Sequence, residues 1–242
     1  MSKNSAKSEF DAHSETYSDE VNKAISFSGL DVDFFTRAKV ERLVSLIERH
    51  IGNPRDLSAL DVGCGVGNSH ALLGKRIGRI SGVDPSSECI VAAMKRNPDI
   101  SYTVSDGNVL PFQDELFDVV FAICVMHHVP PEKWKLFISE MARVTKPGGM
   151  VLVFEHNPLN PLVRKVVSNC AFDKDAVLLR KGNLTRHMNE AGLKNVFGRY
   201  ILTVPSISGW FRTVDDLLGL VPSGAQYFVA GFCPERRGMD IR

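Results

Sequence analysis

The sequence has no cysteine pairing pattern, almost no net charge and no long hydrophobic run. Its five cysteines are odd in number and none stands in a C-x-x-C pair, which argues against a disulfide framework or a zinc site and favours a reducing compartment. With 29 basic and 28 acidic residues the formal net charge is +1. Composition therefore favours neither nucleic acid nor an anionic membrane as a partner.

Hydrophobic runs are too short to span a bilayer, and the N-terminal stretch MSKNSAKSEF lacks the apolar core of a signal peptide. We therefore expect a cytoplasmic protein without a membrane span. The length of 242 residues and the apolar fraction of 44% suit one packed domain. A small molecule is the expected partner, and the expected assembly is a monomer or a homodimer.

What the sequence does contain is a strand, glycine turn, helix and strand unit in residues 59–84. The apolar run ALDV predicts a buried parallel strand that brings Asp61 to its C-terminal edge. Glycines follow at once, where backbone N–H groups can approach a ligand closely: Gly63, Gly65 and Gly67. A helix is expected from about Asn68, and a second apolar strand ends in Asp84.

The glycine spacing separates two candidate ligands. The dinucleotide fingerprint is G-x-G-x-x-G, whereas here the spacing is G-x-G-x-G with Asn68 at the position of the third glycine. An acid directly before the glycines would repel a pyrophosphate and attract an ammonium group. The combination DVGCGVG, followed by VD, resembles motif I and the next acidic residue of class I S-adenosylmethionine-dependent methyltransferases. A tight turn in another α/β fold is the alternative interpretation.

The resemblance implies S-adenosylmethionine as cofactor, with S-adenosylhomocysteine as product. The implied fold is α/β: a Rossmann-like, doubly wound sheet of seven strands in the order 3-2-1-4-5-7-6, mostly parallel with strand seven antiparallel, and with helices on both faces. We divide the single domain 1–242 into a disordered tail (1–9), an N-terminal lid and helix (10–50), a cofactor-binding core (56–154), and substrate-side additions with the last two strands (155–232).

The same resemblance assigns residues to the cofactor. Asp84 would hold the ribose hydroxyls, and Asp106, with Gly107 and Asn108 behind it, would accept a hydrogen bond from the adenine amine; a solvated loop aspartate is the other interpretation of Asp106. Tyr17 would lie in a lid over the cofactor, although a surface helix explains residues 10–30 equally well. The full expected set is Tyr17, Asp61, Gly63, Cys64, Gly65, Gly67, Asp84, Pro85, Asp106, Gly107, Asn108 and Ile123.

Candidate catalytic residues follow two later strands. The most apolar strand, expected over 117–125, runs into the histidines His127 and His128, and His128 stands where the family's V-x-H-H-V pattern has an active-site histidine. A histidine that caps the next helix is the alternative. Glu155 and His156 follow the strand after KPGG and are expected at the same edge. Because adjacent residues at a strand end point to opposite sides, we expect no shared metal.

The implied activity is methyl transfer to a small-molecule acceptor. A hydroxyl oxygen is the favoured acceptor, and the string EHNPLNP resembles a subgroup that modifies sugars and glycan precursors. An N- or C-methyltransferase of a small metabolite, and a non-catalytic protein that only binds S-adenosylmethionine, stay open as alternatives. All the specific signals concern the cofactor, and none identifies the acceptor.

Overall fold

The computed structural model describes residues 31–170, 173, 175–203 and 215–235. The expected tail, the lid and Tyr17 lie outside these residues. The strands are β1 (Ser58–Val62), β2 (Arg79–Asp84), β3 (Ser101–Val104), β4 (Phe117–Ile123), β5 (Thr145–His156), β6 (Lys194–Ile201) and β7 (Gln226–Phe232). The α-helices are α3 (Val32–His50), α4 (His70–Leu73), α5 (Ser87–Arg96), α6 (Trp134–Val144), α7 (Pro161–Asn169) and α8 (Lys181–Glu190).

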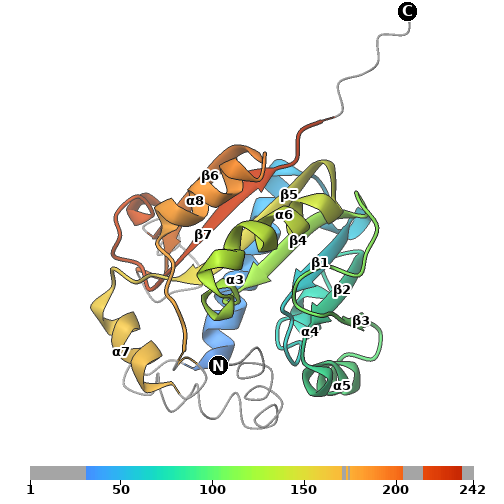
Figure 1. The fold of residues 1–242 in the computed structure, drawn as a ribbon, viewed down its shortest axis with the longest axis horizontal. Coiled ribbons are helices and arrows are strands. Elements are labelled where there is room, and N and C mark those ends of the chain that lie inside the picture. The colour runs from blue at the N-terminus through green and yellow to red at the C-terminus, as the bar shows by residue number, and fades with distance from the viewer. Residues whose placement is uncertain (1–30, 171–172, 174, 204–214, 236–242) are drawn as a thin grey trace, which may run out of the picture.

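The strands form one sheet in the order β3-β2-β1-β4-β5-β7-β6, which Figure 1 shows as a continuous twisted surface. Neighbours from β3 to β5 pair in parallel, whereas β7 runs antiparallel between β5 and β6. The predicted order and the antiparallel seventh strand are confirmed. Since parallel strands end at one edge, β1, β2, β4 and β5 bring their last residues together there.

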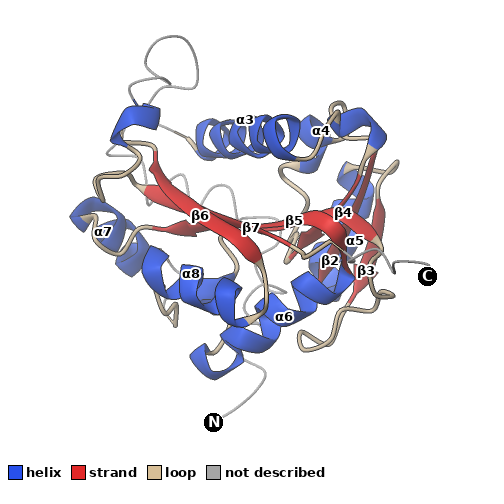
Figure 2. Cartoon of the chain, turned by 90° about the horizontal axis from the view of Figure 1, so that it is seen from above, coloured by secondary structure: helices blue, strands red, loops and turns tan. Residues whose placement is uncertain are grey.

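Helices cover both faces of the sheet, as Figure 2 shows with α3 and α4 on one side and α6 and α8 on the other. On the α3 side, Leu43 and Ile47 are fully buried against the sheet. Asp31 starts that helix by accepting a hydrogen bond from the Phe34 N–H (2.7 Å). The buried apolar residues of α3 recur at the spacing of about 3.6 residues that is typical of a helix with one face against a core. No helix among the described residues is long and apolar enough to cross a bilayer.

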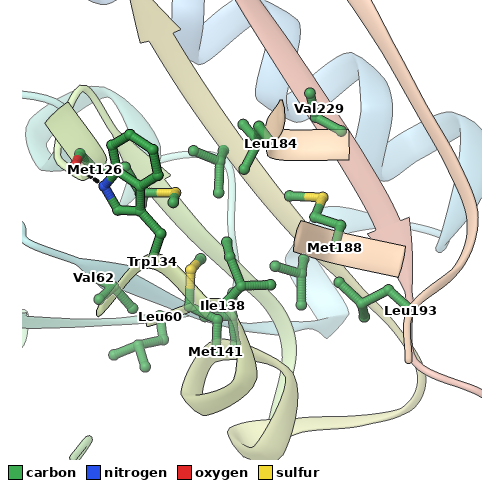
Figure 3. Packing of buried hydrophobic residues seen from close by; sticks show 14 of the residues in the cluster. Leu60, Val62, Met126, Trp134, Ile138, Met141, Leu184, Met188, Leu193 and Val229 are labelled. Atoms are coloured by element: carbon green, nitrogen blue, oxygen red, sulfur yellow. Dashed lines mark hydrogen bonds between the residues drawn. The ribbon is translucent and has the colours of Figure 1, made fainter. Parts of the chain in front are cut away.

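The opposite face packs around α6 and α8. Figure 3 shows Ile138 and Met141 of α6 meeting Leu184 and Met188 of α8 above the sheet, and all four are fully buried. Replacing one such core side chain with alanine lowers the free energy of unfolding by about 2–5 kcal/mol. This layer fixes α6, and with it the turn that precedes it. The turn carries the histidine pair.

Candidate functional site

The glycine turn after β1 depends on its three glycines for different reasons. All three have positive φ: +76° at Gly63, +51° at Gly65 and +69° at Gly67. A Cβ at Gly63 would lie 2.6 Å from Val125 Cγ1, and one at Gly67 would lie 2.8 Å from the Tyr102 hydroxyl oxygen. At Gly65 a Cβ would meet no atom of the described residues within 4 Å. The first and third glycines therefore allow close packing, whereas the second faces open space, where a ligand can approach its backbone.

Asp84 closes this turn from the next strand. Its Oδ2 accepts a hydrogen bond from the Gly65 N–H (2.9 Å), and its Oδ1 accepts one from the Ser86 N–H (2.9 Å). These two contacts orient the Asp84 carboxylate at the glycine turn. Pro85 follows directly, and the Asp84 carbonyl accepts from the Ser105 N–H (3.1 Å), which brings the end of β3 alongside.

Asp61 is held by two residues that sequence reasoning did not include. Its Oδ2 lies 3.0 Å from His70 Nε2, and His70 Nδ1 lies 2.7 Å from the Tyr102 hydroxyl. Burial raises the pKa of Tyr102 to about 12, so the tyrosine keeps its proton. In the His70 tautomer with hydrogen on Nε2, the Tyr102 hydroxyl donates a hydrogen bond to Nδ1 and the Nε2–H donates one to Asp61. This chain leaves Asp61 Oδ1 buried without a hydrogen-bond partner among the described residues, which is an acceptor suited to an ammonium group.

The remaining expected cofactor residues lie nearby. Burial, Asp61 and Asp84 together raise the pKa of Cys64 well above its usual value, so it stays a thiol. Gly107 lies against Pro85, since its Cβ would be 3.8 Å from Pro85 Cβ. The exposed Asp106 accepts from the N–H groups of Asn108 (2.8 Å) and Val109 (3.0 Å), and these bonds lower its pKa. Ile123 ends β4 opposite Phe154.

The candidate catalytic residues form one cluster at the ends of β4 and β5. His127 Nδ1 lies 2.7 Å from Glu155 Oε2, and the ring centroids of His127 and His156 are 5.1 Å apart. His127 and Glu155 are buried, while His128 and His156 are partly exposed. Asp173 completes the cluster, with Oδ1 3.4 Å from His127 Nε2 and 3.5 Å from His128 Nε2. The expectation that Glu155 and His156 meet the histidine pair is confirmed.

The expectation that the two histidines point to opposite sides is wrong. β4 ends at Ile123, and Cys124 adopts a φ of +57°, which breaks the extended backbone. Residues Met126–His128 then form a 3₁₀ turn, where successive side chains are about 120° apart rather than 180°. The two rings therefore lie on one side, with centroids 4.1 Å apart.

Neighbouring groups hold this turn in place. The Trp134 indole N–H donates to the carbonyls of Met126 (3.0 Å) and Val129 (2.9 Å), on either side of the histidines; Figure 3 draws the first of these bonds. Val125, which packs on Gly63, immediately precedes the same turn. The glycine turn and the histidine turn are therefore in direct contact. This contact places the expected cofactor and catalytic residues in one continuous site.

The charges of the cluster differ from one histidine to the next. Burial disfavours the charged form of His127, but Glu155 and Asp173 overcome it and raise the His127 pKa well above its usual value. Burial, with repulsion from His127, lowers the pKa of His128 to about 4 and that of His156 to about 4. Both are therefore neutral near pH 7 and hold a lone pair that can accept a hydrogen bond.

Cys124 and two residues in contact with it were not identified from the sequence. Lys39, a buried residue of α3, places Nζ 3.9 Å from Cys124 Sγ, and Gln226 of β7 places Nε2 3.6 Å from the same sulfur. Burial raises the pKa of Cys124 despite Lys39. These residues, like Asp173, come from segments distant in sequence, and no motif or spacing in the chain indicates that they meet.

Comparisons with known proteins agree with this geometry. Residues 60–153 match a family model described as a methyltransferase domain. The 2-methyl-6-phytyl-1,4-hydroquinone methyltransferase of a Synechocystis strain is 30% identical over 199 residues, which are 74% of this chain and 60% of that protein. The norajmaline N-methyltransferase of Rauvolfia serpentina is 37% identical over 112 residues, covering 42% of this chain and 37% of that protein.

A solved structure gives the fold independently. An S-adenosylmethionine-dependent methyltransferase from Thermotoga maritima has a TM-score of 0.68 at 18% identity, over 94% of this chain and 99% of that one. Identity this low shows the shared fold alone. The chain spans less than two thirds of the length of the first curated relatives it matches, 60%, 54% and 29% of them.

Proposed function

We propose that this chain is a class I S-adenosylmethionine-dependent methyltransferase, as its match to the methyltransferase-domain model and its 30% identity to a methyltransferase support, and that it transfers a methyl group to a hydroxyl-bearing small molecule. The observation that carries this proposal is the contact of Val125 with Gly63, which joins the cofactor turn to the His127, Glu155 and His156 cluster. The residues present fit S-adenosylmethionine as the cofactor. Among the described residues, Asp61 Oδ1 is a buried acceptor without a partner, and no atom occupies the space at the Gly65 Cβ position.

Each part of the site has a distinct task. Bound S-adenosylmethionine supplies a methyl group on positively charged sulfur, so the acceptor oxygen forms an O–C bond while the electron pair of the broken C–S bond stays on sulfur. Asp61, Asp84 and the Gly65 backbone hold the cofactor, and Glu155 fixes the ring of His127. The neutral His128 or His156 accepts the hydroxyl hydrogen bond and takes the proton. Orientation of the two reactants is worth about 7–11 kcal/mol, more than a positioned base contributes.

A second candidate is methylation of a ring carbon in a hydroquinone. The relative that supports it is named for a hydroquinone substrate and is 30% identical. Both candidates use a hydroxyl-bearing acceptor and differ only in the atom that receives the methyl group. A sugar or glycan acceptor would be a case of the first candidate, O-methylation, and only the EHNPLNP string supports it.

The test is incubation of the protein with methyl-labelled S-adenosylmethionine and separate pools of hydroquinones, phenols, sugars, amines and lipids. We expect label on a hydroxyl-bearing pool member, and NMR of the product then distinguishes an O-methyl from a ring C-methyl group. Transfer to amines alone would contradict the proposal. Binding of S-adenosylhomocysteine without transfer to any pool would instead support a binding-only protein.

The role of His156 is tested by His156→Gln with His50→Gln as the matched control. His50 is an exposed histidine at the end of α3. If His156 takes the proton, its replacement lowers turnover by up to about 10²–10⁴-fold without abolishing it, whereas the His50 variant keeps full turnover. Equal rates in the two variants would remove His156 from the proposed mechanism.

A further inference from the structure

Three potential metal ligands meet beside the cofactor turn, although the sequence predicted none. The nitrogens Nε2 of His127 and Nε2 of His128 lie 3.4 Å and 3.5 Å from the same oxygen, Asp173 Oδ1. All three ligand atoms are within 4.8 Å of one another. The prediction of no shared metal rested on histidines pointing apart, and the 3₁₀ turn removes that premise.

Two of the three ligand separations match the edges of a coordination polyhedron better than they match direct hydrogen bonds. Good N–H···O bonds have heavy-atom distances of about 2.7–3.2 Å, as the 2.7 Å contact of His127 with Glu155 does. Around a tetrahedral ion with bonds of about 2.0–2.1 Å, neighbouring ligand atoms lie roughly 3.3–3.5 Å apart. Both nitrogen to Asp173 separations fall in the second range.

The surrounding structure holds the ligands in a manner typical of metal sites. His127 directs its other ring nitrogen to Glu155, the carboxylate–histidine arrangement that sets the tautomer and orientation of a metal-binding imidazole. The chain that follows Asp173 is held at two points: the Val177 N–H donates to the His127 carbonyl (2.8 Å), and the Tyr227 hydroxyl donates to the Leu179 carbonyl (2.6 Å). The three ligands are thus positioned before any ion arrives.

We propose that His127, His128 and Asp173 bind one divalent first-row transition metal ion and leave its remaining coordination positions to the acceptor. Two imidazoles with one carboxylate suit Zn²⁺, Fe²⁺ or Co²⁺ rather than Mg²⁺ or Ca²⁺, which prefer oxygen ligands. The side chains of His128 and Asp173 are 19% and 13% exposed, so an ion and an acceptor oxygen can reach them. A proton shared between His127 and Asp173 is the competing occupant of the same position.

The ion would act on the acceptor hydroxyl. Coordination to a divalent metal lowers the pKa of a bound O–H group. His128, once it is a ligand, no longer serves as the base, so the proton leaves to water and the oxygen keeps the electron pair that forms the bond to the methyl carbon. This role rests on the proposed methyl transfer, whereas the metal site itself does not. It also restricts the acceptor to a molecule whose hydroxyl can coordinate the ion.

The experiment is a calorimetric titration of ZnCl₂ into tag-free protein that has been treated with a chelator and dialysed, repeated with Co²⁺ followed by visible absorption. We expect saturation at one ion per chain. His128→Gln and Asp173→Asn should each weaken binding by at least about tenfold. Asp173→Asn keeps an oxygen that accepts from His127 but loses the charge, so it decides the question if the His128 variant fails to fold. His187→Gln is the matched control, because His187 lies 3.4 Å from Glu190 and no third ligand joins them among the residues that the structure describes. This variant should bind the ions as the parent does.

Absence of saturable Zn²⁺ and Co²⁺ binding in the parent protein would overturn the proposal, as would unchanged affinity in Asp173→Asn. Because the titration measures no methyl transfer, its failure is separate from failure of the proposed function. Metal binding without transfer would support the site and contradict the proposed reaction. Methyl transfer by a protein that binds neither Zn²⁺ nor Co²⁺ would support the proposed reaction and contradict the metal site.

Discussion

The substitution Gly65→Ala tests cofactor binding separately from the stability of the fold. Of the three turn glycines, Gly65 alone has open space at the Cβ position, whereas the same change at Gly63 would press on Val125 inside the protein. The new methyl group would therefore touch no atom of the described part of the chain within 4 Å. It would occupy the space in which a ligand approaches the turn, so binding should respond more strongly than stability.

The two effects have separate magnitudes. An alanine at φ +51° costs about 1–2 kcal/mol because its Cβ crowds the next carbonyl oxygen, and the free energy of unfolding should fall by that amount. Forcing one extra carbon into a packed contact costs about 1–3 kcal/mol. Since 1.4 kcal/mol is tenfold in affinity, binding of S-adenosylhomocysteine should weaken by roughly 5- to 150-fold.

Gly192→Ala provides the matched control. Gly192 follows α8, has φ +89° and also has nothing within 4 Å of its Cβ position, so it carries the backbone strain without the ligand. Urea unfolding should show a loss of stability in both variants, and calorimetry with S-adenosylhomocysteine should show weaker binding in Gly65→Ala alone. Parental affinity in Gly65→Ala would refute the placement of the cofactor at this turn.

Two further changes test other parts of the site and fold. Asp84→Ala should weaken S-adenosylhomocysteine binding by about ten- to several hundred-fold, since hydrogen bonds to a charged group are worth about 1.5–3 kcal/mol; unchanged affinity in calorimetry with an intact fold would contradict the ribose assignment. Although burial alone would raise it, hydrogen bonds from Lys146 and Ser58 lower the pKa of Asp118, so this carboxylate stabilises the fold above its unfolded pKa of about 3.9 and loses that contribution as pH falls through its lower folded pKa. Asp118→Asn should therefore be less stable than the parent at pH 7, with a difference that shrinks below about pH 4 in urea unfolding; a constant difference would count against the ion pair.

Periodicity predicted individual helices and strands, and glycine spacing predicted the turn after β1, whereas the sheet order came from the family resemblance. Burial on one face leaves a repeat of 3.6 residues in α3, and a strand buried on both faces leaves a continuous apolar run such as β4. Both signals are local. The helix expected from Asn68 is instead the single turn α4, because a short helix leaves too few periodic positions to define its bounds.

The catalytic cluster could be predicted only in part. Glu155 and His156 were placed correctly because parallel strands share an edge. The orientation of His127 and His128 was not, because it depends on the backbone reversal at Cys124, a non-glycine residue with positive φ that no sequence pattern marks. Asp173 reaches the site through the docking of a loop by Val177, a contact between distant segments that composition and spacing do not encode.

The antiparallel placement of β7 has a consequence for the order in which the protein can fold during synthesis. β6 pairs only with β7, and β7 lies between β6 and β5. On the ribosome, β6 therefore emerges with no partner strand and stays unpaired until the residues of β7 have left the exit tunnel. Tyr227, which anchors the Asp173 segment through Leu179, arrives with that same strand. The segment that carries Asp173 can consequently be anchored only after β1 and β2, which are synthesised much earlier, are available to pair with each other.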